Sequence, residues 1–190
     1  MIDFNFISTL REESKIMLNY LTQKDPEITA HCIRVAKLSV KIAEKMNIKD
    51  DIFLSALANA TAIHDIGKIQ IKDEILKKKQ LSPDEYEIIK THTLFNIKDF
   101  FNFDVNETTQ KVILQHHERE NASGYPNALK KNQISLEAKI CAVADSFDAM
   151  TSHRYYNIPK TTSEAIEELK NMSGEFYDEK VINAFLLCKT

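Results

Sequence analysis

The chain has 190 residues, 43% of them hydrophobic and 28% charged, which is the composition of a folded globular protein with a substantial core. Its formal net charge of −3 excludes a broad basic surface for duplex nucleic acid, and no segment is apolar over the length that a membrane span needs. The first residues lack the basic start and apolar run of a signal peptide, so we expect a cytoplasmic protein.

Glycine and proline divide the chain into helical segments. The three glycines and four prolines fall between stretches of 3.6-residue hydrophobic periodicity, and alternating patterns bounded by Asn-Gly or Asp-Gly turns are absent. The sequence therefore predicts an all-α fold with helices, in chain order, over about 4–21, 26–46, 51–67, 82–101, 106–117, 135–151, 163–171 and 178–187. Residues 69–79 are expected to form a loop and a short helix.

The helix boundaries carry recognisable capping signals. We expect residues 1–24 to form an N-terminal helix that packs on or leads into one domain over 25–190. Its apolar stripe could pair two copies, but packing on the chain's own core is the favoured interpretation. Asp25 can cap the next helix with Pro26 at its first position, and a capping box opens the helix after Ser82. The run 77–79, three lysines, is interpreted as a solvated helix end, with steering of an anionic substrate as the less favoured alternative.

The stretch Ala62-Ile63-His64-Asp65-Ile66-Gly67-Lys68 needs an explanation beyond packing. It ends an apolar helix, where a buried ionised carboxylate is costly unless it is paired or bound to metal. With Gly67 as a left-handed cap, Asp65 would lie in the last helical turn, at the negative end of the helix dipole. A bound cation would relieve both conflicts, so the stretch predicts a metal site.

Five of the six histidines lie within or next to apolar helical stripes, and carboxylates accompany them. A single such histidine is more often a hydrogen-bonded core residue than a ligand, but a core of this size rarely needs five. Divalent ions take imidazole and carboxylate ligands, so the set predicts a site for two or more metals. The three cysteines are scattered, which argues against structural zinc and favours Fe, Mn or a similar ion.

The order and spacing of these motifs resemble the HD-GYP branch of the HD phosphohydrolases. The motifs are His31, His64-Asp65 with Gly67-Lys68, His92, His116-His117-Glu118-Arg119, Gly124-Tyr125-Pro126, and Val143-Ala144-Asp145 with Asp148. The resemblance covers residues 25–190 and implies an HD-domain helical bundle with added C-terminal helices, which hydrolyses cyclic di-GMP at a site with two or three metals, usually iron or manganese. By position it implies the metal ligands His31, His64, Asp65, His92, His116, His117 and Asp145, with Asp65 bridging and Glu27 as an extra ligand of three-metal members.

The resemblance also suggests substrate contacts. Lys68 would hold the scissile phosphate and assist catalysis with Asp65, although a lysine at a helix end also has a purely electrostatic explanation. Arg154 would bind a phosphate, with an ordinary surface arginine as the alternative. Tyr125, next to Gly124, would line the guanine site or serve only as a loop anchor. Asp148 is expected to support a ligand or a helix contact rather than bind metal.

Three parts of the sequence depart from the family pattern. Asn121-Ala122 stands where Asp-Gly is usual, Asn157 replaces a common basic residue, and Glu27-Ile28 replaces a Tyr-Thr pair. The first of these leaves the metal-ligand positions unaffected, and the presence of Glu27 in the third favours a site with three metals.

We therefore expect a phosphodiesterase that converts cyclic di-GMP to linear pGpG, with further hydrolysis to GMP left open. The alternatives are an HD phosphohydrolase of another nucleotide and a non-catalytic module that binds cyclic di-GMP or a signalling partner. A regulatory protein partner and a homodimer are left open.

Overall fold

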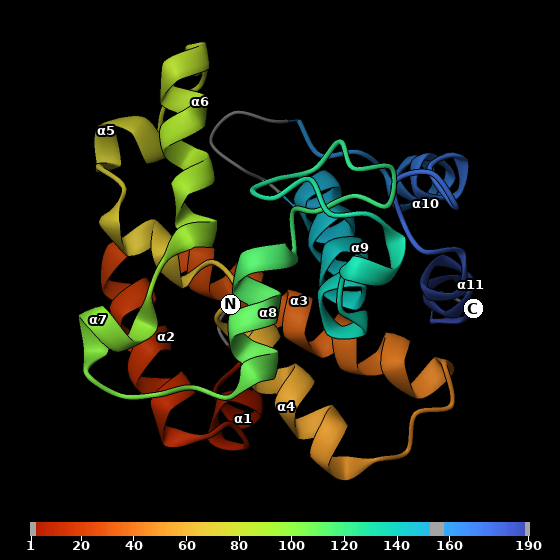
Figure 1. Cartoon of the computed structure of the whole chain (residues 1–190), viewed down its shortest axis with the longest axis horizontal. Helices are drawn as coiled ribbons and strands as arrows, with labels where there is room; N and C mark the ends of the chain where they lie inside the picture. The colour runs from red at the N-terminus through yellow and green to blue at the C-terminus, as the bar shows by residue number, and fades with distance from the viewer. Residues whose placement is uncertain (1–2, 153–157, 189–190) are drawn as a thin grey trace.

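The computed structural model describes residues 3–152 and 158–188, and apart from two isolated β-bridges every regular element in these residues is helical (Figure 1). The all-α prediction is therefore confirmed. The elements are α1 (Phe4–Ser8), α2 (Glu12–Lys24), α3 (Pro26–Lys45), α4 (Asp51–Ala62), η1 (Ile66–Gln70), α5 (Asp73–Leu76), α6 (Pro83–Lys90), η2 (Thr91–Leu94), α7 (Ile97–Phe101), α8 (Glu107–Gln115), η3 (Lys131–Gln133), α9 (Leu136–Thr151), α10 (Thr162–Asn171) and α11 (Glu179–Leu187), where η denotes a 3-10 helix.

The predicted capping residues start the helices. The Asp25 carboxylate accepts a hydrogen bond from the Glu27 backbone N–H at 2.9 Å, and Pro26 occupies the first turn of α3. Ser82 and Glu85 form a complete capping box at α6. Such caps satisfy N–H groups that have no partner within the helix, so local sequence fixes these boundaries.

Helix α3 lies at the centre and separates two hydrophobic clusters. Val35 and Ile42 belong to the first cluster, which α4, α9, α10 and α11 complete. Cys32 and Ile33 belong to the second, which α2, α8 and the residues around η1 and α7 complete. Figure 1 shows α9, α10 and α11 on one side of the bundle and α2 and α7 on the other. His31 lies on α3, whose buried residues belong to both clusters.

Two predicted long helices are interrupted. The N-terminal helix breaks between α1 and α2, where the Arg11 backbone N–H donates to the Asn59 side-chain oxygen of α4 at 2.8 Å. The helix predicted over 82–101 divides into α6, η2 and α7, with Asn96 capping α7. Helix α2 packs on α3, and the predicted domain boundary at residues 24 and 25 stays a prediction. Within the described ranges no helix is long and apolar enough to cross a membrane.

Candidate metal centre

Helix α4 ends earlier than predicted, and this early end positions His64 and Asp65. The last residue of α4 is Ala62, so both side chains project from a tight turn that leads into η1. The prediction that Gly67 is a left-handed cap, with Asp65 in the last helical turn, is wrong. Gly67 lies inside η1, and a Cβ atom there would be 2.1 Å from the His92 carbonyl oxygen. Its missing side chain lets η1 pack against η2, which carries His92.

The structure brings the predicted ligand-type residues together from five parts of the chain. They are His31 on α3, His64 and Asp65 after α4, His92 on η2, His116 and His117 at the end of α8, and Asp145 on α9. His117 is partly buried and the others are buried. Two groups of side chains are close enough to hold one ion each, namely Asp65, His92, His116 and His117 in one group and His31, His64 and Asp65 in the other. Asp65 is common to both groups, so its position suits a bridging carboxylate.

Asp65 directs one carboxylate oxygen to each group. Its Oδ1 lies 3.3 Å from His92 Nε2 and 3.9 Å from His116 Nε2. Its Oδ2 lies 3.6 Å from His64 Nε2 and 2.5 Å from Lys68 Nζ. Asp145 lies beside the second group, because its Oδ1 is 3.0 Å from His31 Nε2 and 3.9 Å from His64 Nε2.

The hydrogen bonds of the imidazoles leave lone pairs facing one another. Nδ1 of His64, His92 and His116 lies 2.6 to 3.0 Å from backbone carbonyl oxygens, which only accept, so each Nδ1 carries the proton. A neutral ring then has a lone pair on Nε2. Two of these atoms, on His92 and His116, are 3.2 Å apart. His64 Nε2 and Asp65 Oδ1 are buried without a hydrogen-bond partner among the described residues. Bound cations would satisfy all of these atoms, so the residues fit a metal centre with more than one ion.

The surroundings keep the imidazoles of His64, His92, His116 and His117 neutral and the Asp65 carboxylate ionised. Burial lowers the pKa of His92 to about 4 and that of His116 to about 3. Burial alone would raise the pKa of Asp65, but Lys68 and the neighbouring histidines bring it well below its usual value. These are the protonation states in which the groups bind a cation.

Metal-free protein is expected to lose stability as the pH falls from 7 to 5. The unfolded chain protonates its histidines near pH 6.5, whereas the pKa of His92 in the folded protein is about 4. Between these values the unfolded state binds more protons, so the free energy of unfolding falls by up to about 1.4 kcal/mol per pH unit for each such histidine. Urea unfolding of EDTA-treated protein at pH 7, 6 and 5 measures this slope. A free energy of unfolding that stays constant or rises on acidification would contradict the neutral buried imidazoles.

Asp148, one turn after Asp145 on α9, holds His31 in place. Its Oδ2 accepts from His31 Nδ1 at 2.6 Å, and both of its oxygens accept from the Arg34 guanidinium, at 2.7 and 2.9 Å. Although burial opposes ionisation, these contacts lower the pKa of Asp148 to about 2. The carboxylate therefore orients His31 so that Nε2 faces Asp145.

The D148N substitution is expected to weaken metal binding about 10- to 100-fold, the usual cost of losing a partner that orients a ligand. The amide keeps the size of the side chain but removes the charge that holds both His31 and Arg34. Competition with a chelator measures the affinity, with the exposed α4 residue Asp51 changed in D51N as the matched control. Equal affinities for D148N and the wild type would contradict this role.

The irregular stretch 119–133 is fixed to the histidine pair. Glu118 is buried, and its two carboxylate oxygens accept from the backbone N–H groups of Asn127 at 2.7 Å and Leu129 at 2.9 Å. A Cβ atom on Gly124 would lie 2.5 Å from the His117 carbonyl oxygen, so Gly124 allows the loop to lie against this segment. No role for Glu118 was predicted from the sequence. Its position directly after two histidines could have indicated that it supports the site.

Tyr125 contacts the centre through its ring. The ring stacks on His117, with centroids 4.7 Å apart and an angle of 26° between the planes. These contacts support the loop-anchor alternative, and a guanine contact stays a prediction.

In the same loop Ala122 has φ +64°, in the left-handed region that favours glycine. The loop thus takes a backbone shape suited to the glycine of the usual Asp-Gly pair.

A cavity of about 860 Å³ opens onto the centre. Its lining includes the buried residues Asp65, His31 and His92, which we call the floor of the cavity. Glu27, Lys68 and Tyr125 also line it. Glu27 is exposed in the first turn of α3, one turn before His31. Gly124 does not line the cavity, and Arg154 and His153 lie outside the described residues. The volume is within the range of small-molecule sites and suits a ligand as large as a dinucleotide.

Comparison with known proteins gives concordant results. A family model described as an HD domain matches residues 15–181. The chain is 43% identical over 174 residues to a cyclic di-GMP phosphodiesterase of Thermotoga maritima, covering 90% of this chain and 47% of that protein. It is 29% identical over 191 residues to a 3′3′-cGAMP-specific phosphodiesterase of Vibrio cholerae, covering 97% of this chain and 36% of that protein. A solved HDG"Y"P protein from Bdellovibrio bacteriovorus shares the fold, with a TM-score of 0.70 and 23% identity over 86% of this chain and 53% of that one. The chain thus spans half or less of the length of the two curated relatives.

Proposed function

The chain belongs to the HD-domain family, and on that basis we propose that it is a metal-dependent phosphodiesterase that opens cyclic di-GMP to linear pGpG. The observation that carries the proposal is the position of Asp65, whose two oxygens face two separate sets of imidazole lone pairs at the floor of a cavity. The 43% identity to a cyclic di-GMP phosphodiesterase supports the substrate.

We assign the metal ligands to the predicted set, with Asp65 as the bridge. The set is His31, His64, Asp65, His92, His116, His117 and Asp145. The donors are imidazole nitrogens and carboxylate oxygens, a set that suits Fe or Mn. Two or three such ions would neutralise phosphate charge and supply an activated water at neutral pH.

Lys68 is proposed to act on the phosphate. Its Nζ lies 2.5 Å from Asp65 Oδ2, and its side chain lines the cavity. The ammonium group is thus held at the floor, where it would donate to a non-bridging phosphate oxygen and stabilise charge that develops during hydrolysis. The hydrolysis adds water across one phosphodiester and leaves a linear dinucleotide with a terminal phosphate. Arg154 remains a predicted second phosphate contact.

A centre with three ions differs from one with two in whether Glu27 binds an ion. If it supplies a ligand to a third ion, E27A is expected to lower the metal content by about one ion per chain while the other two remain. Elemental analysis of the wild type and E27A measures this difference, with the exposed Glu44 of the same helix changed in E44A as control. Equal metal contents in all three proteins would contradict the three-ion centre.

A substrate panel tests the specificity. Metal-loaded protein is incubated with cyclic di-GMP, 3′3′-cGAMP and cyclic di-AMP, and products are resolved by chromatography. We expect the highest kcat/KM for cyclic di-GMP and pGpG as the first product. A preference for 3′3′-cGAMP would instead support the alternative that the substrate is another nucleotide. The Vibrio cholerae relative is named as specific for 3′3′-cGAMP. Tight cyclic di-GMP binding without turnover would favour the non-catalytic module.

A further inference from the structure

The segment from α5 to α6 forms one wall of the cavity, opposite the loop 119–133. Figure 1 shows α5 and α6 extending away from the rest of the bundle, with α6 facing the loop. The residues of this segment that line the cavity are Leu76, Lys78, Lys79, Gln80, Leu81 and Tyr86. We call this set the hairpin wall. The floor of the cavity supplies imidazoles and carboxylates, whereas the hairpin wall supplies apolar, aromatic and cationic groups.

The hairpin wall is held in place by ion pairs at both ends. Lys24 of α2 lies 2.6 Å from Asp73 at the start of α5. Lys78 donates to both carboxylate oxygens of Glu85, at 2.7 and 2.8 Å, and Glu85 also closes the capping box of α6. These contacts connect the loop before α6 to its first turn, so the wall presents a defined surface to the cavity.

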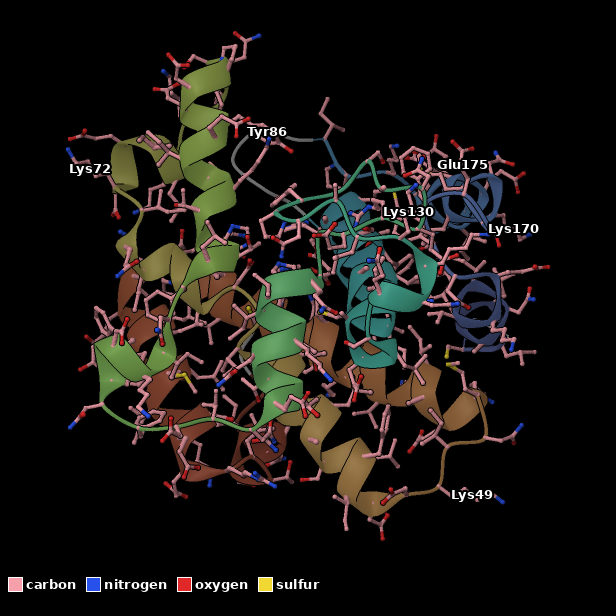
Figure 2. The ribbon with its side chains drawn as sticks, in the orientation of Figure 1. Lys49, Lys72, Tyr86, Lys130, Lys170 and Glu175 are labelled. Atoms are coloured by element: carbon pink, nitrogen blue, oxygen red, sulfur yellow. The ribbon has the colours of Figure 1, made fainter. Side chains whose placement is uncertain are left out.

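Tyr86 is the aromatic residue of this wall. Its side chain is 47% exposed, and Figure 2 shows it on the side of α6 that faces the loop 119–133. Lys90, one turn later, places Nζ 5.0 Å from the Tyr86 ring centroid and 5.5 Å from that of Tyr125. A cation between two rings restrains both of them. Since Tyr125 already stacks on His117, Tyr86 is the ring that keeps exposed area for a ligand.

Lys79 is the cation of the wall that has no acidic partner among the described residues. Lys78 is engaged by Glu85, and Lys77 lies 3.0 Å from Asp73. Lys79 is exposed and makes no ion pair within the part of the chain that the structure describes, yet it lines the cavity. A cyclic dinucleotide has two phosphates, and only one is cleaved at a time. Lys79 offers a cation for the other phosphate, away from the floor.

We propose that the hairpin wall recognises the dinucleotide, with Tyr86 stacking on a purine base and Lys79 contacting the phosphate that is not being cleaved. This inference rests on the proposed function for the identity of the ligand. It assigns recognition to a part of the cavity that contributes no metal ligand, and it changes the interpretation of the run 77–79 from a solvated helix end to a partial substrate contact.

The test compares Y86A, Y86F and K79Q with the matched control K72Q. Lys72 lies just before α5, outside the cavity lining, and Figure 2 shows it on the outer side of the hairpin. K72Q therefore removes the same charge from the same hairpin. Two quantities are measured: the ratio of kcat/KM for cyclic di-GMP to that for bis(p-nitrophenyl) phosphate, a diester without a purine or a second phosphate, and the calorimetric Kd of cyclic di-GMP in EDTA.

Y86A is expected to lower the kcat/KM ratio and raise the Kd about tenfold, in line with the value of base–aromatic stacking. Y86F should retain both quantities, since the ring remains. K79Q should change both in the same direction by about threefold to tenfold, and K72Q should match the wild type. Ratios and affinities of Y86A and K79Q equal to those of the wild type would overturn the proposal.

The two proposals fail in different ways. A wild type that binds cyclic di-GMP but does not cleave it, with weaker binding in Y86A and K79Q, would contradict the phosphodiesterase and leave the hairpin wall supported. A wild type that cleaves cyclic di-GMP, with the variants unaffected, would contradict the hairpin wall alone. A wild type that neither binds nor cleaves it would contradict both.

Discussion

Replacing Asp65 by alanine is expected to reduce the metal content to one ion per chain or fewer and to lower kcat/KM for cyclic di-GMP by more than about 100-fold. Loss of an outer partner of a metal ligand already costs about 10- to 100-fold, and Asp65 is placed to touch two ions at once. Removal of the carboxylate also takes the only oxygen donor from the group formed with His92, His116 and His117. Elemental analysis and turnover of the same preparation measure both effects.

The matched control for D65A is D51A. Asp51 is exposed in the first turn of α4, the helix whose end presents Asp65, so this change removes a carboxylate from the same helix without touching the cavity. We expect normal metal content and turnover for D51A. Full metal content in D65A, with turnover like that of the wild type, would contradict the bridging role.

Replacing Gly67 by alanine is expected to destabilise the protein by about 1–3 kcal/mol, the usual cost of overpacking a core, and to reduce metal binding as well. The added Cβ atom would lie 2.1 Å from the His92 carbonyl oxygen and 2.8 Å from the His92 Cα. Because these are backbone atoms, η1 and η2 must move apart, which displaces His92 from Asp65. Chemical unfolding and elemental analysis measure the two losses.

Gly174 provides the matched control for G67A. It has φ +79° but open space around its Cα, so alanine there strains the backbone without a clash. G174A is expected to cost about 1–2 kcal/mol and to leave metal content unchanged. If G67A binds metal normally, with stability equal to that of the wild type, the close contact between η1 and η2 does not position His92.

Local sequence signals predicted much of the fold. Asp25 with Pro26 and Ser82 with Glu85 act within one helical turn, so they determine helix starts without help from the rest of the chain. The convergence of the histidines was also predictable, because each lies on an apolar stripe that must face a common core. The HD-domain family predicted from the motifs is confirmed.

Features that depend on distant contacts were not predictable. The break between α1 and α2 coincides with a contact from Arg11 to Asn59, 48 residues away in the sequence. The role of Gly67 depends on the backbone of His92, which only the folded chain brings close. The position of Tyr86 on a cavity wall likewise depends on how α6 faces the loop 119–133, and no local pattern encodes that.

The most direct test of the metal-dependent phosphodiesterase is a turnover assay on the wild type reloaded with Fe or Mn under reducing conditions. We predict that linear pGpG forms from cyclic di-GMP when metal is bound and that its formation stops after EDTA treatment. Wild-type protein that holds its metal by elemental analysis yet yields no pGpG would contradict the account.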